Sequence, residues 1–317
     1  MSGETIFCIG HKSPDTDSVA SAVGMAFYLN QIGRDAVACT AGTMNRESRY
    51  IFDLFAVDEP MVLTDATGKK LWLVDHSEYA QAVSGAEKAE IVGMTDHHAV
   101  GDISAAERYF DSNAANCTNV YHLITERGIT VSKEIAAVLL AGILSDTENL
   151  TKRSVTQEDR DACTALQKTA GVDDCAALYG EMLRAKLDFG GLTDEEVFYR
   201  DYKEYERDGF RYGIACVDVM RSAEIDAAFE RLRRMMRRVY DGNLLDLLML
   251  KVSGADGSCS AVTYIGKEAE QCRALMQTAF EGMCRFSGET MLFSPSISRK
   301  RGMAPRIDEA LKKERNF

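Results

Sequence analysis

Short apolar runs alternate with helical patterns through the first half of the chain. Four runs predict buried strands, at residues 5–10, 35–40, 71–75 and 90–96. Two intervening segments predict helices, one with an apolar face at Val19, Ala22, Val23 and Ala26 and one at residues 45–55. This alternation is typical of an α/β domain with a mainly parallel sheet and helices on both faces.

A longer apolar segment, residues 132–147, predicts a helix that is buried in the middle of this domain. The pattern then changes at the pair Gly190–Gly191, and Thr193 with Glu196 predicts the start of a new helix. We therefore expect two domains, a larger N-terminal one at residues 1–188 and a smaller C-terminal α/β one at residues 189–317.

Three apolar runs in the second half also predict strands, at residues 211–219, 244–252 and 259–266. We expect a helix between the first two, with an apolar stripe at Leu232, Met235, Met236 and Val239, and another helix after the third. The five arginines of residues 231–240 would then cover the solvated flanks of the first helix. We prefer this interpretation to a phosphate-binding patch.

Composition narrows the class of protein. The chain has 317 residues, of which 46% are hydrophobic and 27% charged, as in soluble globular proteins. The net charge of −12 leaves no general basic surface for nucleic acid, and no apolar run approaches the ~20 residues that span a bilayer. Nine cysteines occur singly, without a C-x-x-C pair, which indicates reduced thiols and a cytoplasmic protein.

Four segments carry candidate metal ligands, and three of them directly follow predicted strands. In chain order the segments are "HKSPDTD" with His11, Asp15 and Asp17, "VDHS" with Asp75 and His76, "TDHH" with Asp96, His97 and His98, and "LSDT" with Asp146. Ligands of open parallel sheets gather beyond the carboxyl ends of the strands, so we expect the segments to converge there. Only one of the five histidines, His122, lies outside them, and we expect it to be an ordinary helix residue.

This set of side chains favours a transition-metal site. Carboxylates mixed with imidazoles suit Mn²⁺, Co²⁺ or Zn²⁺ better than Ca²⁺, whose sites use oxygen ligands alone. The number of candidate ligands exceeds what one ion requires. A bridging carboxylate would hold two ions about 3.5–4 Å apart, the separation found in enzymes that displace phosphate groups in line.

The same segments resemble the ordered motifs of the DHH phosphoesterase superfamily. The C-terminal "SISRKRGMAP" is similar to the serine–arginine–lysine signature of its manganese-dependent (family II) inorganic pyrophosphatases, and the resemblance extends over almost the whole chain. It implies a DHH metal-binding catalytic domain, a DHHA2-type substrate-binding domain that closes over pyrophosphate, and a homodimer.

The resemblance also implies a role for each motif residue. The metal ligands would be His11 and Asp15 at one ion, Asp17, His97 and Asp146 at the other, and Asp75 as a bridge. The residues facing the substrate would be His98, Lys203, Arg299 and Lys300. The residues orienting the ligands would be His76 and Asp96.

The implied reaction is hydrolysis of pyrophosphate to two orthophosphates by a hydroxide that bridges two divalent ions. Metal coordination lowers the pKa of bound water from 15.7 to about 7, which provides a nucleophile at neutral pH. The expected cofactor is a pair of Mn²⁺ ions per subunit. Co²⁺ is an alternative, and a further Mg²⁺ or Mn²⁺ would arrive with the substrate.

The chain departs from the family pattern at several positions and keeps all the expected metal ligands. Ser13 and Ser77 stand where the family usually has asparagine, Asn116 where glycine is usual, and Arg301 and Gly302 where lysine and glutamine are common. These departures concern rate, metal preference and substrate choice more than the class of reaction.

Two alternatives stay open. A DHH phosphodiesterase acting on cyclic dinucleotides or short oligonucleotides has a different second domain with a "GGGH"-like loop, whereas no histidine follows His122 here. A non-catalytic phosphate-binding protein with a decayed site would have lost ligands, and none is missing. Both observations favour pyrophosphate hydrolysis.

Overall fold

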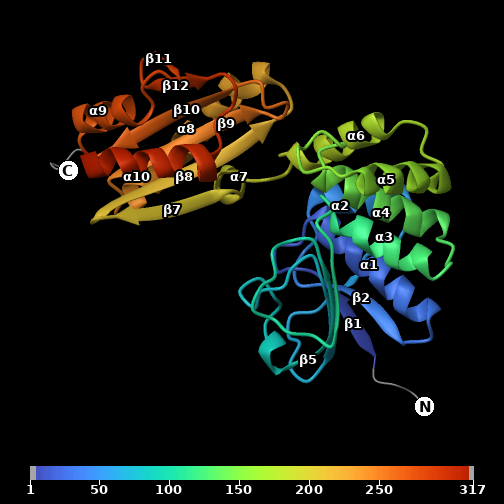
Figure 1. Ribbon diagram of the computed structural model, residues 1–317. Coiled ribbons are helices and arrows are strands. Elements are labelled where there is room, and N and C mark those ends of the chain that lie inside the picture. The colour runs from blue at the N-terminus through green and yellow to red at the C-terminus, as the bar shows by residue number, and fades with distance from the viewer. Residues whose placement is uncertain (1–4, 314–317) are drawn as a thin grey trace. The chain divides into compact units, whose positions relative to one another are not determined.

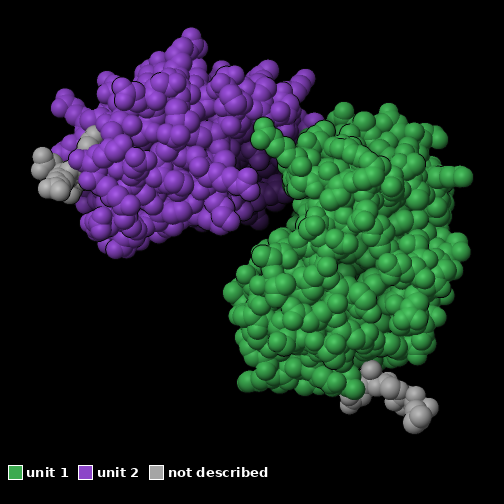
Figure 2. Space-filling model, viewed as in Figure 1, with its two compact units in different colours: residues 1–186 green, residues 187–317 purple. Residues whose placement is uncertain are grey.

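The computed structural model describes residues 5–313. The chain divides into two compact units, Met1–Lys186 and Leu187–Phe317, which are coloured separately in Figure 2. Among the described residues, no helix combines the length and the apolar character needed to cross a membrane.

The first unit is built on a parallel sheet of six strands in the order β3-β2-β1-β4-β5-β6. The strands are β1 (Ile6–Ile9), β2 (Ala36–Thr40), β3 (Met61–Val62), β4 (Lys70–Val74), β5 (Glu90–Asp96) and β6 (Glu107–Phe110). The chain moves outward from β1 in one direction and from β4 in the other, so the order reverses between these two adjacent strands. In open α/β sheets a ligand crevice forms at this switch point.

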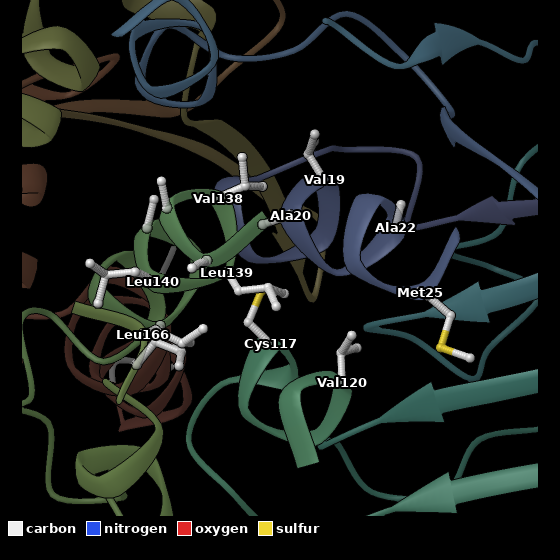
Figure 3. Packing of buried hydrophobic residues seen from close by; sticks show 14 of the residues in the cluster. Val19, Ala20, Ala22, Met25, Cys117, Val120, Val138, Leu139, Leu140 and Leu166 are labelled. Atoms are coloured by element: carbon white, nitrogen blue, oxygen red, sulfur yellow. The ribbon is translucent and has the colours of Figure 1, made fainter. Parts of the chain in front are cut away.

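Helices cover one face of this sheet, as Figure 1 shows. They are α1 (Thr16–Gln31), α2 (Arg46–Leu54), α3 (Asn116–Glu126), α4 (Lys133–Asp146), α5 (Gln157–Ala170) and α6 (Cys175–Leu187). The helix expected at residues 132–147 is α4, and nine of its residues are buried. Figure 3 shows side chains of this core on α1, α3 and α4, among them Val19, Val120 and Leu139.

The sequence predicts helices on the opposite face of the sheet as well, but loops cover it in the structure. Its core joins strand residues such as Ile9 and Leu73 to loop residues such as Leu63, Val83 and Ile103. The only regular element on these loops within residues 63–105, apart from the strands, is the 3₁₀ turn η1 (Ala86–Lys88). Right-handed crossovers place the β4–β5 and β5–β6 connections on this face, and here they are loops instead of α-helices.

The second unit has a mixed sheet of six strands in the order β11-β12-β10-β9-β8-β7. Its strands are β7 (Tyr202–Arg207), β8 (Phe210–Val219), β9 (Leu247–Gly254), β10 (Ser260–Gly266), β11 (Arg285–Ser287) and β12 (Thr290–Phe293). Only β8 and β9 pair in parallel; the other neighbours are antiparallel. The predicted strands correspond to β8, β9 and β10.

Helices pack on both faces of the second sheet. They are α7 (Asp194–Tyr199) and α8 (Ile225–Gly242) on one face and α9 (Ala269–Ala279) and α10 (Ala304–Lys313) on the other, with short turns η2 (Ser222–Glu224) and η3 (Arg299–Met303). The capping box predicted at the start of α7 is present, because Thr193 and Glu196 exchange hydrogen bonds. The predicted apolar stripe of α8 is buried, and its arginines are exposed.

Candidate metal centre

The loop after β1 presents its ligands through the start of α1. Asp15 caps this helix by accepting a hydrogen bond from the backbone N–H of Ser18 with Oδ1, at 2.9 Å. The other oxygen, Oδ2, is left free to face Nε2 of His11 at 3.5 Å. Helix capping therefore fixes one half of the carboxylate and directs the other half at the histidine.

Asp75 lies at the centre of the site. It directly follows β4, is 3% exposed, and adopts a left-handed backbone conformation with φ of 61°. Its Oδ2 lies 3.4 Å from Nε2 of His11, and its Oδ1 lies 3.1 Å from Nε2 of His97. The two oxygens of Asp75 thus face two different histidines, which suits a carboxylate that bridges two ions.

The ring orientation of His97 is fixed from behind. Its Nδ1 lies 3.0 Å from the carbonyl oxygen of Asn113, and a carbonyl can only accept, so Nδ1 carries the hydrogen. Nε2 then faces Oδ1 of Asp75 and, at 3.6 Å, Oδ2 of Asp146. Histidines that bind metals have this arrangement, in which one nitrogen donates to a carbonyl and the other binds the ion.

Asp17 approaches the site from the first turn of α1. It is buried and accepts hydrogen bonds from the backbone N–H groups of Asn116 (2.7 Å) and Cys117 (2.9 Å), at the start of α3. Gly142 on α4 permits this close approach, because a Cβ there would lie 2.3 Å from Sγ of Cys117 and 3.1 Å from Oδ1 of Asp17. The N–H groups at the positive end of α3 offset part of the cost of burying this carboxylate.

Asp146 is the last residue of α4 and is 30% exposed at its side chain. Its Oδ1 forms an ion pair with Nζ of Lys152 at 3.2 Å. Three residues in this region, Glu148, Asn149 and Leu150, have positive φ values of 51°, 53° and 61°. Such a run is strained for residues other than glycine, so the turn that returns Lys152 to Asp146 is held at some conformational cost.

The candidate ligands form groups whose donor atoms lie within 4.8 Å of one another. The groups are His11, Asp15 and Asp75; Asp17, His97 and Asp146; and Asp75, His97 and His98. The first two bring together residues that the family resemblance assigns to one ion and to the other, with Asp75 in the first of these two groups alone. His122, on α3, belongs to none of these groups.

Two further observations show that these residues fit divalent ions. Oδ1 of Asp75 is buried and makes no well-directed hydrogen bond, so it has an acceptor position to offer. Without a cation or a proton between them, Nε2 of His97 and the carboxylate oxygens around it would place lone pairs against one another. Mixed imidazole and carboxylate donors are the ligand chemistry of Mn²⁺ and related ions.

The pKa values express how strongly the cluster favours positive charge. Burial lowers the pKa of His11 and His97, but the neighbouring carboxylates outweigh it and raise both values to about 10. Burial raises the pKa of Asp17, as do Asp75 and Asp146, to about 8. Divalent ions would take the place of these protons on the two partly buried histidines and the buried carboxyl group, and would balance the negative charge of the cluster.

Asp96 and His76 lie behind the cluster. Asp96 is fully buried, and its Oδ1 accepts hydrogen bonds from the backbone N–H groups of His97 and His98 and lies 2.9 Å from Nδ1 of His98. His76 donates from Nδ1 to the carbonyl oxygen of Val74, and burial lowers its pKa. Asp96 therefore sets the direction of His98, whose side chain is 59% exposed.

The sequence analysis missed one buried acid that supports the site. Glu47, in the first turn of α2, is 0% exposed, and its Oε2 accepts hydrogen bonds from the hydroxyls of Thr16 and Ser145, both at 2.9 Å. Thr16 stands between Asp15 and Asp17, and Ser145 precedes Asp146. Glu47 thus connects the two chain segments that carry these ligands, and Lys186 pairs with it at 3.3 Å.

The sequence signal for Glu47 was weak. It lies in a helix predicted from an apolar pattern. A glutamate in the first turn of a helix is usually exposed to solvent, where it interacts favourably with the helix dipole. Only the burial of α2 against the loop after β1 reveals the role. The "NRES" segment, which caps this helix with Asn45, was the available clue.

The predicted substrate residues lie in the second unit. Lys203, on β7, and Lys300, in η3, are exposed. Arg299 is bound to Asp201, donating to its carbonyl oxygen at 2.7 Å and to its Oδ1 at 2.6 Å. All three cations lie in the second unit, and both of these contacts of Arg299 are with a residue of that unit.

The departures from the family pattern have different environments. Ser77 is buried, and its hydroxyl accepts a hydrogen bond from Gly101 N–H at 2.9 Å, which holds the loop that follows His98. Asn116 offers its backbone N–H to Asp17, while both polar atoms of its buried side chain lack partners. Ser13, Arg301 and Gly302 are not buried.

Comparison with known families agrees with both units. The model of the DHH family, N-terminal domain, matches residues 5–143, and the model of the DHHA2 domain matches residues 180–310.

Similar proteins extend over the full length of the chain. A manganese-dependent inorganic pyrophosphatase of Methanothrix thermoacetophila is 33% identical over 314 residues, covering 98% of this chain and 99% of that protein. Another, from Methanocaldococcus jannaschii, is 27% identical over 314 residues, covering 96% and 98%.

A solved structure agrees as well. The crystal structure of a Methanococcus jannaschii protein assigned to the family II inorganic pyrophosphatases has a TM-score of 0.70 and 26% identity, covering 97% of this chain and 99% of that one. An exopolyphosphatase-related protein from Bacteroides fragilis, at 14% identity and a TM-score of 0.53, shares the fold. The chain therefore belongs to the manganese-dependent inorganic pyrophosphatase family, with a DHH domain followed by a DHHA2 domain.

Proposed function

We propose that this protein hydrolyses inorganic pyrophosphate to two orthophosphates with a pair of Mn²⁺ ions. The observation that carries the proposal is the position of Asp75, whose two oxygens face the histidines of two ligand groups. Relatives named as manganese-dependent inorganic pyrophosphatases support both the substrate and the metal.

The proposed ligands are His11 and Asp15 for one ion, Asp17, His97 and Asp146 for the other, and Asp75 for both. When bound, such a pair supplies Lewis-acid activation of the phosphate and a hydroxide nucleophile at neutral pH. Co²⁺ has the same donor preferences and is proposed as a substitute. A further Mg²⁺ or Mn²⁺ would accompany the pyrophosphate.

The chain's own contribution to the chemistry begins with His98. Its Nδ1 is held by the buried carboxylate of Asp96, so Nε2 points away from that partner and toward solvent. The hydrogen bond to Asp96 raises the pKa of His98, which favours a hydrogen on both ring nitrogens. Nε2–H would then donate to a phosphate oxygen as negative charge shifts onto it.

Lys203, Arg299 and Lys300 are proposed to bind the phosphate groups. Arginine offers a planar pair of N–H donors and lysine a compact charge, and both neutralise charge on transferring phosphoryl groups. Asp201 fixes two of the guanidinium nitrogens of Arg299, which presets the orientation of this side chain. A homodimer and a cytoplasmic location complete the proposal, by family resemblance and cysteine usage respectively.

The test is a side-by-side assay of phosphate release from pyrophosphate, a cyclic dinucleotide and a short oligonucleotide. Protein stripped with a chelator is reloaded with Mn²⁺, Co²⁺ or Mg²⁺ before each assay. We expect activity on pyrophosphate that depends on Mn²⁺ or Co²⁺ and is lost on chelation. Activity on either nucleotide but not on pyrophosphate would overturn the substrate assignment.

A further inference from the structure

Lys251 occupies an unusual place for a lysine, in the interior of the second sheet. Only 9% of it is exposed, and its neighbours across β9 are Cys216 on β8 and Val262 on β10. Within residues 5–313, its ammonium group has neither an ion-pair partner nor a hydrogen bond. Lysines are rarely so buried without a partner, because removing an unpaired charge from water is costly.

The charged end of Lys251 still reaches the surface of the unit. Its Nζ makes no hydrogen bond within the described residues and is not sealed from solvent. The aliphatic stem is therefore buried while the ammonium group opens to water, as long basic side chains often arrange themselves. This geometry leaves the charge available to an anion.

Strand alternation places Lys251 on the same face of the sheet as Lys203. Met249, two residues before Lys251, belongs to the core under α9 and α10, and so does Ile214, two residues before Cys216. Lys203 is directly opposite Ile214 on the neighbouring strand, so it projects from that face too. Three adjacent strands thus carry Lys203, Cys216 and Lys251 on one side.

Arg299 lies over the same side of these strands. It is anchored to Asp201, whose carbonyl oxygen also accepts the backbone N–H of Cys216 at 2.9 Å. Burial raises the pKa of the Cys216 thiol to about 11, while Lys251 and Arg299 both act to lower it. Both cations are therefore close to the same thiol.

The segment that carries the arginine–lysine pair is tied down beside Lys251. The hydroxyl of Ser296 lies 3.3 Å from that of Ser253, which is two residues beyond Lys251 on β9. The backbone N–H of Ile297 donates to the hydroxyl of Ser260, directly opposite Ser253 on β10. On the sheet, Lys251 therefore lies between two attachment points of this segment. One is formed by Ser253 and Ser260, and the other by Asp201.

We infer that Lys251 is a further substrate-binding residue, which contacts a phosphate group of the substrate together with Arg299. The inference rests on the proposed function and adds a fourth cation to Lys203, Arg299 and Lys300. A phosphate oxygen would be a partner for the ammonium group of Lys251, which has none among the described residues, and a charge-assisted hydrogen bond to phosphate would stabilise it. Neither the apolar run on β9 nor the C-terminal signature marks this lysine in the sequence.

The test measures orthophosphate binding by calorimetry and pyrophosphate kinetics on the full chain loaded with Mn²⁺. Lys251→Met keeps the aliphatic stem and removes the charge. We expect it to weaken orthophosphate binding about tenfold and to raise KM for pyrophosphate by a similar factor, with kcat changed less than about twofold. Lys251→Arg, which restores the charge, should recover most of the binding.

The matched control is Lys267→Met, which removes the same charge from a lysine of the same unit whose side chain is 74% exposed beside Asp246. It should leave binding and KM unchanged. If Lys251→Met does not fold, as judged by circular dichroism, Lys251→Gln carries the same expectation. A folded, uncharged variant with normal orthophosphate binding and normal KM would overturn the inference.

The two proposals fail separately. If the wild-type protein does not hydrolyse pyrophosphate but loses orthophosphate binding on removal of the Lys251 charge, the proposed function is wrong and the anion-binding role of Lys251 stands. If hydrolysis is normal and the lysine variants behave like the wild type, only the inference about Lys251 fails.

Discussion

The candidate metal ligands of the first unit and the cations of the second unit are held in different ways. Asp75 is 3% exposed, and the ring of His97 is fixed by the carbonyl oxygen of Asn113. Lys203 and Lys300, by contrast, are exposed. The first unit orders its charged groups through buried contacts, whereas these two lysines of the second unit are free to adapt to a ligand.

This difference agrees with what each set of residues is proposed to bind. Metal coordination requires ligand atoms within about 0.2 Å of their ideal distances, so its side chains need support from behind. A lysine that neutralises phosphate acts as a point charge and tolerates more movement. We therefore expect substitutions in the first unit to abolish function and substitutions in the second unit to reduce it by degrees.

The largest effect should come from Asp75→Ala. Removing the carboxylate that faces both histidines would leave two ligand groups without their common member, and we expect kcat/KM to fall at least about 10³-fold. Phosphate release and calorimetric titration with Mn²⁺ would measure the loss. Asp65→Ala, at an exposed loop aspartate, is the control. Near-normal activity of Asp75→Ala would remove Asp75 from the centre of the site.

Arg299→Ala should have the next largest effect, a loss of about 10²-fold in kcat/KM. It removes the planar pair of guanidinium N–H groups that is proposed to donate to phosphate. Mn²⁺ affinity should be unchanged, since no candidate ligand is altered. Loss of Mn²⁺ binding in this variant, or a fall in activity as large as that of Asp75→Ala, would contradict the expected difference between the two units. Arg285→Ala, an exposed arginine of the same unit, serves as the control.

Glu47→Gln tests whether the candidate ligands of the first unit depend on a buried side chain that holds their segments in place. Glutamine retains an oxygen acceptor for Thr16 and Ser145 but loses the charge that pairs with Lys186. We expect Mn²⁺ affinity to weaken about tenfold, as for other residues that orient metal ligands. Calorimetric titration with Mn²⁺ measures this directly.

Lys186→Met provides the matched variant for Glu47. The side chain of Lys186 is 44% exposed, so its ion pair is partly screened and its loss should weaken Mn²⁺ binding only about threefold. Glu87→Gln, at an exposed glutamate, should have no effect. Unchanged Mn²⁺ affinity in Glu47→Gln would show that the ligand segments are held in place without this residue.

The contrast between the units also explains what the sequence could predict. Most candidate metal ligands stand in short segments at strand ends, as Asp75 and His97 do, so local patterning and parallel-sheet topology place them together. The fold class and the α7 capping box were predicted for the same reason, because each depends on nearby residues. Lys203 and Arg299 were located only through the family signature.

The missed features depend on contacts between distant segments. Glu47 becomes a support residue only when α2 packs against Thr16 and Ser145, which are 31 and 98 residues away. Lys251 is notable only because it is buried without a partner, which an apolar strand pattern does not reveal. The loops on the second face of the first sheet replace expected helices for a similar reason, since their apolar residues follow no helical period.

The smallest effect on activity should come from a buried acid that supports structure alone. Asp159, in the first turn of α5, accepts hydrogen bonds from the backbone N–H groups of Ala114 (2.9 Å) and Thr156 (2.8 Å) and from the hydroxyl of Thr118 (2.7 Å). Asp159→Asn should lower the free energy of unfolding by about 2 kcal/mol, because an amide cannot accept all three bonds. We expect kcat/KM to change less than about threefold.

The pH dependence of that loss distinguishes Asp159 from the candidate metal ligands. Burial raises the pKa of Asp159, but its hydrogen bonds prevail and lower it below the usual range. A depressed folded-state pKa contributes stability above the unfolded-state value of about 3.9, and this stability is lost as pH falls through the folded-state value. In chelator-treated protein, the wild type should therefore be more stable than Asp159→Asn at pH 7, and the difference should shrink as the pH falls below about 4. A difference in unfolding free energy that stayed constant from pH 7 to pH 3 would mean that the carboxylate charge of Asp159 contributes nothing to stability.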